Sequence, residues 1–144
     1  GWYADEVDIF ELKYQVPNGM SYNSYVILDD KSSLMYTVDA AFGQQWLNNV
    51  EGALQGRRPD YLVIQHMEPD HSANIPLFLE KYPDVQVVAT AAAFKMMNQF
   101  FSLPSDMKQM PVANGGELAL GVHKLNFVCA PMVHWPEVMM SYES

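Results

Sequence analysis

The sequence predicts an α/β (α+β) fold in which a mixed β-sheet is covered by helices. In the N-terminal segment, apolar residues mostly recur at every second position, which is typical of strands. Four apolar residues then recur at every fourth position, which is typical of a helix with one apolar stripe. These residues are Phe42, Trp46, Val50 and Leu54. Beyond them, short apolar runs alternate with amphipathic segments, as in sheets whose strands are joined by helices.

The N-terminal part of the chain is expected to be antiparallel β structure. Residues 7–16 are predicted to form one strand with a bulge near Phe10, because their period of two slips there. A turn over residues 17–19 follows. Two more strands, over residues 25–28 and 33–38, are separated by a short polar turn.

The rest of the chain is predicted to alternate strands with helices. Residues 61–65 are an apolar run without alternation, which indicates a strand buried on both faces. The remaining predicted elements are a helix over 72–82, a strand over 85–90, a helix over 91–101, a turn over 114–116 and strands over 117–120 and 124–130. No linker or internal repeat interrupts this pattern, so residues 1–144 are expected to form one domain.

The composition is that of a globular protein. With 144 residues, of which 49% are hydrophobic, the chain can bury a sizeable core. The formal net charge of −9 argues against nucleic acid as a partner, and no apolar run is long enough to cross a bilayer. Cys129 is the one cysteine, which excludes an internal disulfide and favours a reducing cytoplasm. It stands in an apolar run, where we expect a small buried hydrophobic side chain.

A cluster of metal-binding residue types directly follows the apolar run that begins at residue 61. His66, Glu68 and Asp70 alternate, so extended backbone would direct all three to the same side. His71 would face another direction unless the chain turns there, and such a turn would present ligands to two adjacent metals. His134 also follows an apolar strand. Both segments therefore open from strand ends and can share one metal site at the rim of the sheet.

Two motifs resemble those of a known family. They are H-x-E-x-D-H at residues 66–71 and, after 62 intervening residues (134 − 71 − 1), H-W-P-E at residues 134–137. Their order and spacing resemble the flavodiiron proteins (A-type flavoproteins). Residues 21–25 and 61–66 are also similar to that family. The resemblance implies a metallo-β-lactamase-like αββα sandwich and a non-haem diiron centre that reduces dioxygen or nitric oxide.

The resemblance also implies a role for each candidate ligand. His66, Glu68 and His134 would hold one iron, and Asp70 and His71 would serve the second. In the family, a bridging aspartate and a further histidine complete the two-metal site. In this sequence no aspartate follows Asp106 and no histidine follows His134.

The 144 residues are therefore expected to be the N-terminal half of that sandwich, with an incomplete two-iron ligand set and an uncovered apolar sheet face. The family's flavodoxin-like domain, which binds FMN, is absent from them. FMN would then belong to another domain or partner chain, and electrons would come from a donor such as rubredoxin or a flavoprotein. A homo-oligomer or a complementing chain would complete the site.

Two other functions remain open at this stage. In hydrolases of the same superfamily a histidine stands where Glu68 stands here, and their nitrogen-rich site suits zinc. A carboxylate adds negative charge and a harder oxygen donor, which favours iron. The alternatives to a diiron oxidoreductase are a zinc-dependent hydrolase and an inactive truncated module that binds little metal.

Overall fold

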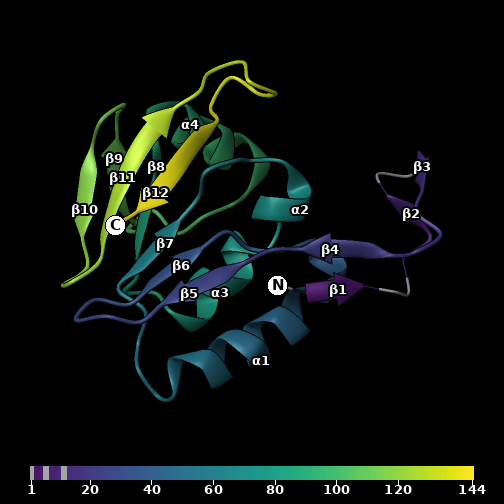
Figure 1. Ribbon diagram of the computed structural model, residues 1–144, viewed down its shortest axis with the longest axis horizontal. Coiled ribbons are helices and arrows are strands. Elements are labelled where there is room, and N and C mark those ends of the chain that lie inside the picture. The colour runs from purple at the N-terminus through teal and green to yellow at the C-terminus, as the bar shows by residue number, and fades with distance from the viewer. Residues whose placement is uncertain (1, 5–6, 11–12) are drawn as a thin grey trace.

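The computed structural model describes residues 2–4, 7–10 and 13–144 and has a layered α/β architecture (Figure 1). A five-stranded sheet with the order β5-β6-β7-β8-β9 forms the middle layer. β5 is antiparallel to β6, and the strands from β6 to β9 run parallel. The strands are β5 (Tyr25–Ile27), β6 (Ser33–Met35), β7 (Tyr61–Val63), β8 (Gln86–Thr90) and β9 (Lys108–Val112).

The central strands of this sheet are buried on both faces, as predicted from their unbroken apolar runs. Leu34, Leu62 and Val87 lie in register on one face and belong to the core beneath the helices. The next residue of each strand points to the opposite face and belongs to a second core. Those residues are Met35, Val63 and Val88.

Helices cover the first face of the sheet. They are α1 (Gly43–Leu54), α3 (Ile75–Lys81) and α4 (Ala91–Phe100), with the short η1 (Ala40–Phe42) before α1 and α2 (Pro69–Ser72) before α3. The predicted apolar stripe is buried at Trp46, Val50 and Leu54, whereas Phe42 lies in η1. No helix in the described residues is long and apolar enough to cross a membrane.

The single helix predicted over residues 72–82 is wrong at its start. The chain forms α2, breaks at Ala73 and Asn74, and resumes as α3. The break is stabilised by contacts with a segment distant in sequence, because the backbone N–H of Asn74 donates to Thr37 Oγ1 and its side-chain amide donates to Val38 O. Pro76 stands in the first turn of α3, where a proline costs no helical hydrogen bond.

A three-stranded antiparallel sheet covers the second face. It has the order β10-β11-β12, with β10 (Glu117–Ala119), β11 (Lys124–Cys129) and β12 (Met139–Glu143). Leu118, Leu125, Phe127 and Met139 point inward and pack on the five-stranded sheet. Cys129 packs against this core at the end of β11, as expected of a small hydrophobic side chain, but it is half-buried and not fully buried.

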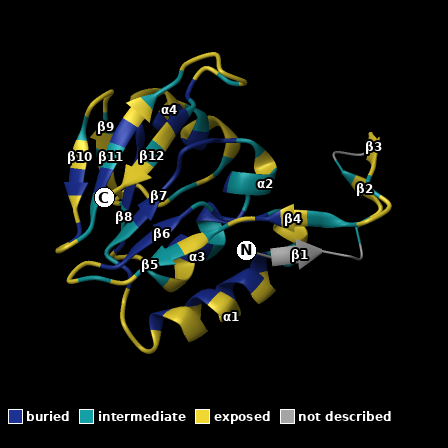
Figure 2. Cartoon of the chain, in the orientation of Figure 1, coloured by how far each residue is buried: buried dark blue, intermediate teal, exposed yellow. Residues whose placement is uncertain are grey.

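The outer face of this second sheet carries exposed apolar side chains, which Figure 2 shows as exposed positions on β11 and β12. Val128 and Met140 are paired across the two strands and are 47% and 54% exposed. Tyr142 is 68% exposed. The uncovered apolar sheet face expected from the sequence is therefore on the second sheet, whereas the central strands of the five-stranded sheet are buried on both faces.

The N-terminal strand predicted over residues 7–16 is also wrong, although Glu11 and Leu12 lie outside the described residues. The segment forms a hairpin of β2 (Ile9–Phe10) and β3 (Tyr14–Gln15), which lies to one side of the layered body (Figure 1). The chain reverses there, because the N–H of Val16 donates to Asp8 O at 2.8 Å. A second small antiparallel pair joins β1 (Trp2–Ala4) to β4 (Met20–Tyr22).

Candidate metal centre

The first four candidate ligands lie between β7 and the end of α2. His66 and Glu68 stand in the connecting segment, and Glu68 is the N-cap of α2 with an extended backbone (φ −57°, ψ 140°). Pro69 begins the helix, where its fixed φ is favourable. Asp70 and His71 therefore lie on the first helical turn. This is the turn that the sequence required if His71 was to face the same site.

His134 comes from the other sheet, in the loop between β11 and β12. The loop is tight, since the N–H of Met132 donates to Trp135 O at 2.9 Å. Met132 and His134 both have left-handed backbone, with φ of 64° and 80°. Such a conformation costs about 1–3 kcal/mol for a residue other than glycine and is tolerated where the surroundings hold it. The loop brings the His134 side chain to His66, with the two ring centroids 5.1 Å apart.

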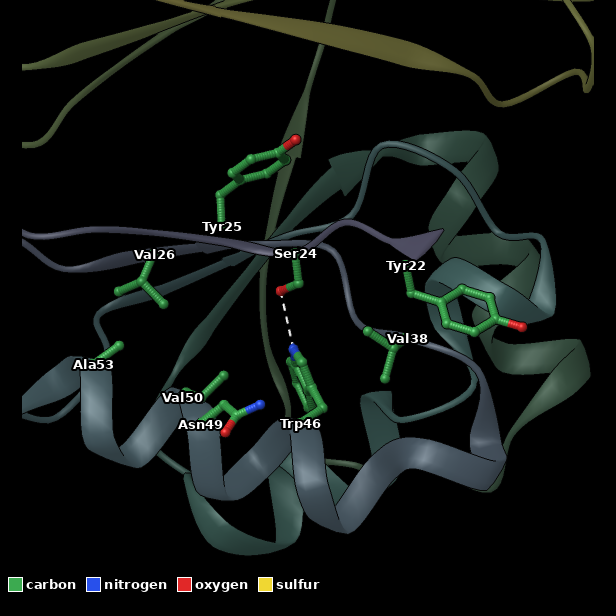
Figure 3. A pocket seen from close by; sticks show the side chains of 9 residues that line it. All are labelled: Tyr22, Ser24, Tyr25, Val26, Val38, Trp46, Asn49, Val50 and Ala53. Carbon is green, nitrogen blue, oxygen red and sulfur yellow. Dashed lines mark hydrogen bonds between the residues drawn. The ribbon is translucent and has the colours of Figure 1, made fainter. Parts of the chain in front are cut away.

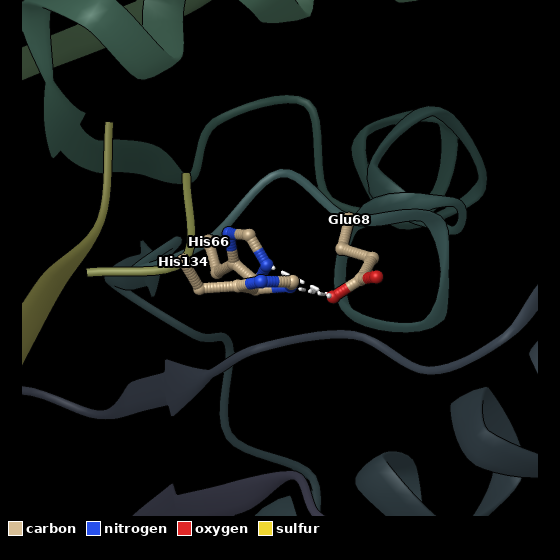
Figure 4. Close-up of side chains that lie close together, drawn as sticks. All are labelled: His66, Glu68 and His134. Carbon is tan, nitrogen blue, oxygen red and sulfur yellow. Dashed lines mark hydrogen bonds and ion pairs between the residues drawn. The ribbon is translucent and has the colours of Figure 1, made fainter. Parts of the chain in front are cut away.

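His66, Glu68 and His134 meet at one carboxylate oxygen (Figure 4). The Nε2 atoms of His66 and His134 are each 3.0 Å from Glu68 Oε2. One ligand atom from each of the three residues lies within 4.8 Å of the others. His66 is buried, whereas His134 is exposed. This arrangement of two imidazoles and one carboxylate can hold a metal ion.

Glu68, Asp70 and His71 form a second group, in which one ligand atom from each residue again lies within 4.8 Å of the others. His71 Nε2 lies 3.3 Å from Asp70 Oδ2, and the His66 and His71 ring centroids are 5.6 Å apart. Glu68 belongs to both groups. The five residues predicted from the sequence are thus brought together as two adjacent groups that share one carboxylate.

The electrostatics of the second group fit a cation. Burial raises the pKa of the Asp70 carboxyl, and the neighbouring Glu68 carboxylate raises it further. Burial lowers the pKa of the His71 imidazole, which favours its neutral, metal-binding form. Asp70 Oδ1 is buried and has no hydrogen-bond partner among the described residues. A divalent cation would supply both the missing partner and the charge that lets Asp70 ionise.

Two neighbouring side chains had no assigned role in the sequence reasoning. Tyr36 packs against the His71 ring with centroids 5.0 Å apart, and burial raises the pKa of its hydroxyl. Glu137 is buried and contacts His66. Glu137 is the last residue of the H-W-P-E motif at residues 134–137, which was the available signal for it, and none pointed to Tyr36.

Two clefts lie away from these ligands. A cleft of about 340 Å³ separates α1 from β4 and β5 (Figure 3). In it the Trp46 indole N–H donates to Ser24 Oγ at 2.9 Å, and this oxygen donates in turn to Tyr36 O. A second cleft, of about 510 Å³, opens between the two sheets. Neither cleft is lined by any of the five candidate ligands.

Two packed sheets, helices on one side and a histidine–carboxylate cluster at the strand ends define a metallo-β-lactamase-like domain. The family model for the ODP family beta lactamase matches residues 20–144, and the chain belongs to this family.

Comparison with individual proteins agrees with this assignment. The chain is 37% identical over 137 residues to Diflavin flavoprotein A 1 of Synechocystis, covering 94% of this chain and 24% of that protein. It is 34% identical to a nitric oxide reductase of Moorella thermoacetica, covering 90% of this chain and 32% of that protein. The flavodiiron protein of Giardia intestinalis superposes with a TM-score of 0.90 at 25% identity, covering 98% of this chain and 34% of that one. The chain thus spans about a quarter to a third of the length of these proteins.

Proposed function

We propose that this chain is the iron-binding part of a diiron oxidoreductase that reduces dioxygen, nitric oxide or both. His66, Glu68 and His134 would hold one iron, and Asp70 and His71 would contribute to the second. Kinship with diflavin and flavodiiron proteins and with a nitric oxide reductase supports the reaction class. The bridging ligand, the FMN and the electrons would come from another domain or a partner chain, in the cytoplasm.

The single observation that carries the proposal is the position of Glu68. Its Oε2 lies 3.0 Å from Nε2 of His66 and 3.0 Å from Nε2 of His134. Any metal held by both histidines would therefore also contact this carboxylate. A hard anionic donor favours iron in its higher oxidation state. Zinc has no redox chemistry, whereas two adjacent irons can each deliver an electron to a small diatomic substrate.

The chain's own residues would orient the ligands and control access. The Trp135 ring packs edge-on against His66, with centroids 5.2 Å apart and an interplanar angle of 88°, and so covers one side of the His66 ring. His134 is exposed, which leaves its side of the cluster open to a substrate or to a completing chain. We also propose that an electron donor such as rubredoxin or a flavoprotein, and a second copy or another chain, act on this open side.

The proposal is tested by loading the chain with Fe(II) without oxygen and then adding dioxygen or nitric oxide. Near-ultraviolet charge-transfer absorption should appear as the iron oxidises. His134→Ala should abolish it, and His123→Ala should not, because His123 lies outside the cluster and bonds Glu143. No iron-dependent signal in the wild-type chain would contradict the proposal.

A zinc-dependent hydrolase is the second candidate, since the two imidazoles of the first group, His66 and His134, also suit zinc. Hydrolysis of ester or lactam substrates by the zinc-loaded chain, without any redox reaction of the iron-loaded chain, would favour it. An inactive module would retain neither metal and show neither reaction.

A further inference from the structure

Glu137 is a buried carboxylate that contacts the Nδ1 side of the His66 ring. It stands in the loop before β12 and is 2% exposed. Its Oε1 lies 2.8 Å from the backbone nitrogen of Met67 and 2.8 Å from Nδ1 of His66. Its other carboxylate oxygen is buried without a hydrogen-bond partner among the described residues.

The contacts of the two ring nitrogens favour a proton on Nδ1 of His66. A backbone N–H can only donate, and an ionised carboxylate oxygen can only accept. Oε1 therefore accepts from Met67, and it can accept from His66 Nδ1 as well. Nε2 of His66 also lies 3.0 Å from a carboxylate oxygen, Glu68 Oε2, but Nε2 of His134 lies at the same distance from that oxygen and can donate to it instead. With the proton on Nδ1, the lone pair of Nε2 is available for a metal.

We propose that Glu137 is a positioning residue that fixes His66 in the Nδ1–H tautomer, and that its buried negative charge strengthens metal binding at Nε2. Metal-binding histidines commonly donate their other ring N–H to such a carboxylate. The effect of the Glu137 charge on metal binding rests on the proposed function, because it requires a bound metal. The effect of Glu137 on the His66 tautomer concerns the metal-free chain alone.

Glu137 also ties the two ligand-bearing segments to each other. Its backbone carbonyl accepts a hydrogen bond from Thr90 Oγ1 at the end of β8, at 3.1 Å. Two residues further on, the N–H of Met139 donates to Gln65 O, next to His66. The loop that carries His134 is thereby held at a fixed distance from the segment that carries His66.

Two substitutions separate a positioning role from a simple packing role. Glu137→Gln retains an oxygen that Met67 and His66 can both donate to, but removes the charge. Glu137→Leu fills a similar volume and removes both the acceptor and the charge. Glu80→Gln, on the exposed side of α3, is the matched control.

The first readout is the nitrogen-15 NMR spectrum of the His66 ring in the metal-free chain, recorded above the ordinary histidine pKa of about 6.5. The wild type, Glu80→Gln and Glu137→Gln should all show the Nδ1–H tautomer, and Glu137→Leu should lose it. A wild-type chain in the Nε2–H tautomer would overturn the proposal, as would a folded Glu137→Leu chain that keeps Nδ1–H.

The second readout is affinity for Co(II) or Fe(II), measured by competition with a chelator. Glu137→Gln should weaken binding by about 10–100-fold, the usual cost of an altered outer partner, while Glu80→Gln leaves it unchanged. An unchanged affinity in Glu137→Gln would overturn the role of the charge, even if Glu137→Leu fails to fold. If the wild-type chain bound neither metal, the proposed function and the charge role would both fail, and the NMR result would still decide the tautomer.

Discussion

Glu68 is the residue on which the choice of metal depends. It is the shared member of both ligand groups and the only carboxylate within 3.0 Å of the nitrogens of two histidines in the described residues. Exchanging it for an imidazole would leave a nitrogen-rich site with less negative charge. Such a site suits zinc better than iron in its higher oxidation state.

Glu68→His should therefore lower the preference for iron over zinc by about tenfold or more, which corresponds to about 1.4 kcal/mol. The measurement is the ratio of the two metals retained after loading from an equimolar mixture without oxygen. Glu80→His on the exposed side of α3 is the control. An iron preference unaffected by Glu68→His would show that this carboxylate does not select the metal.

The five ligand candidates were predictable from the sequence because chemical type and spacing are local properties. His66, Glu68 and Asp70 alternate along the segment, and a turn was needed for the next residue. The role of Glu137 could not be predicted in this way. Its partners, Met67 and His66, are 70 and 71 positions away, and only the packing of the two sheets brings them together.

At the scale of elements, the start of α1 is fixed by its contact with the segment before α3. A Cβ at Gly43 would collide with Asn74 Oδ1 and lie 2.8 Å from Asn74 Cγ. Asn74 cannot move aside without losing the bonds from its side-chain amide to Val38 O and Asp39 O. Gly43 is therefore required by close approach.

Gly43→Ala should destabilise the chain by about 1–3 kcal/mol, the usual cost of overpacking. Gly52→Ala is the matched control in the same helix, because a Cβ there meets nothing within 4 Å. Removing backbone freedom at this helical position should stabilise by about 0.5–1 kcal/mol. Denaturant unfolding of both variants measures the difference. Equal effects of the two substitutions on stability would contradict a close contact between Gly43 and Asn74.

Two contacts between His123 and ionisable carboxyl groups hold the turn between β10 and β11. The N–H of His123 donates to Asp29 and lowers the pKa of that carboxyl. The His123 ring bonds Glu143 on β12, and this hydrogen bond raises the pKa of the imidazole. A raised histidine pKa means that its stabilisation is fully present below the unfolded pKa of about 6.5 and is lost as the pH rises through the folded pKa.

His123→Asn should therefore lower the melting temperature at pH below about 6.5 and have a smaller effect at higher pH. Thermal unfolding of both chains over a pH series measures this. The Asp29 contact uses the backbone and should survive, so its own stabilisation is still lost only as the pH falls through the lowered Asp29 pKa. A difference in melting temperature between the wild type and His123→Asn that grows as the pH rises would contradict a stabilising contact between the charged His123 ring and Glu143.

Element type was predictable where the apolar period is long, and element boundaries were not. The stripe of α1 and the buried runs of β7 and β8 give clear patterns over several residues. The division between α2 and α3 depends on Thr37 and Val38, which are distant in sequence from Asn74. β12 went unpredicted, since its strand character depends on pairing with β11.

At the scale of the whole molecule, the candidate metal centre lies where the two sheets meet. His66 follows a strand of the five-stranded sheet, and His134 lies in a loop of the three-stranded sheet. The ligands can converge only when the sheets are packed together. Phe127, which is fully buried between them, is the largest side chain of the core that holds them.

Phe127→Ala should cost about 3–5 kcal/mol of stability through the cavity it leaves, and should weaken metal binding although it removes no ligand. Phe100→Ala is the control, since Phe100 is 47% exposed at the end of α4. Chemical unfolding and chelator competition on the same samples give the two quantities. A destabilised Phe127→Ala chain with unchanged metal affinity would show that the cluster forms without the packed sheets.

The metal content of the chain, measured by elemental analysis after anaerobic iron loading together with the solution mass, tests the proposed metal centre most directly. We expect stoichiometric iron in the wild-type chain, and its loss when His66, Glu68 and His134 are replaced together by alanine. The solution mass shows whether a second copy accompanies the iron. A wild-type chain that retains no iron, or a triple variant that retains as much as the wild type, would contradict an iron site at these residues.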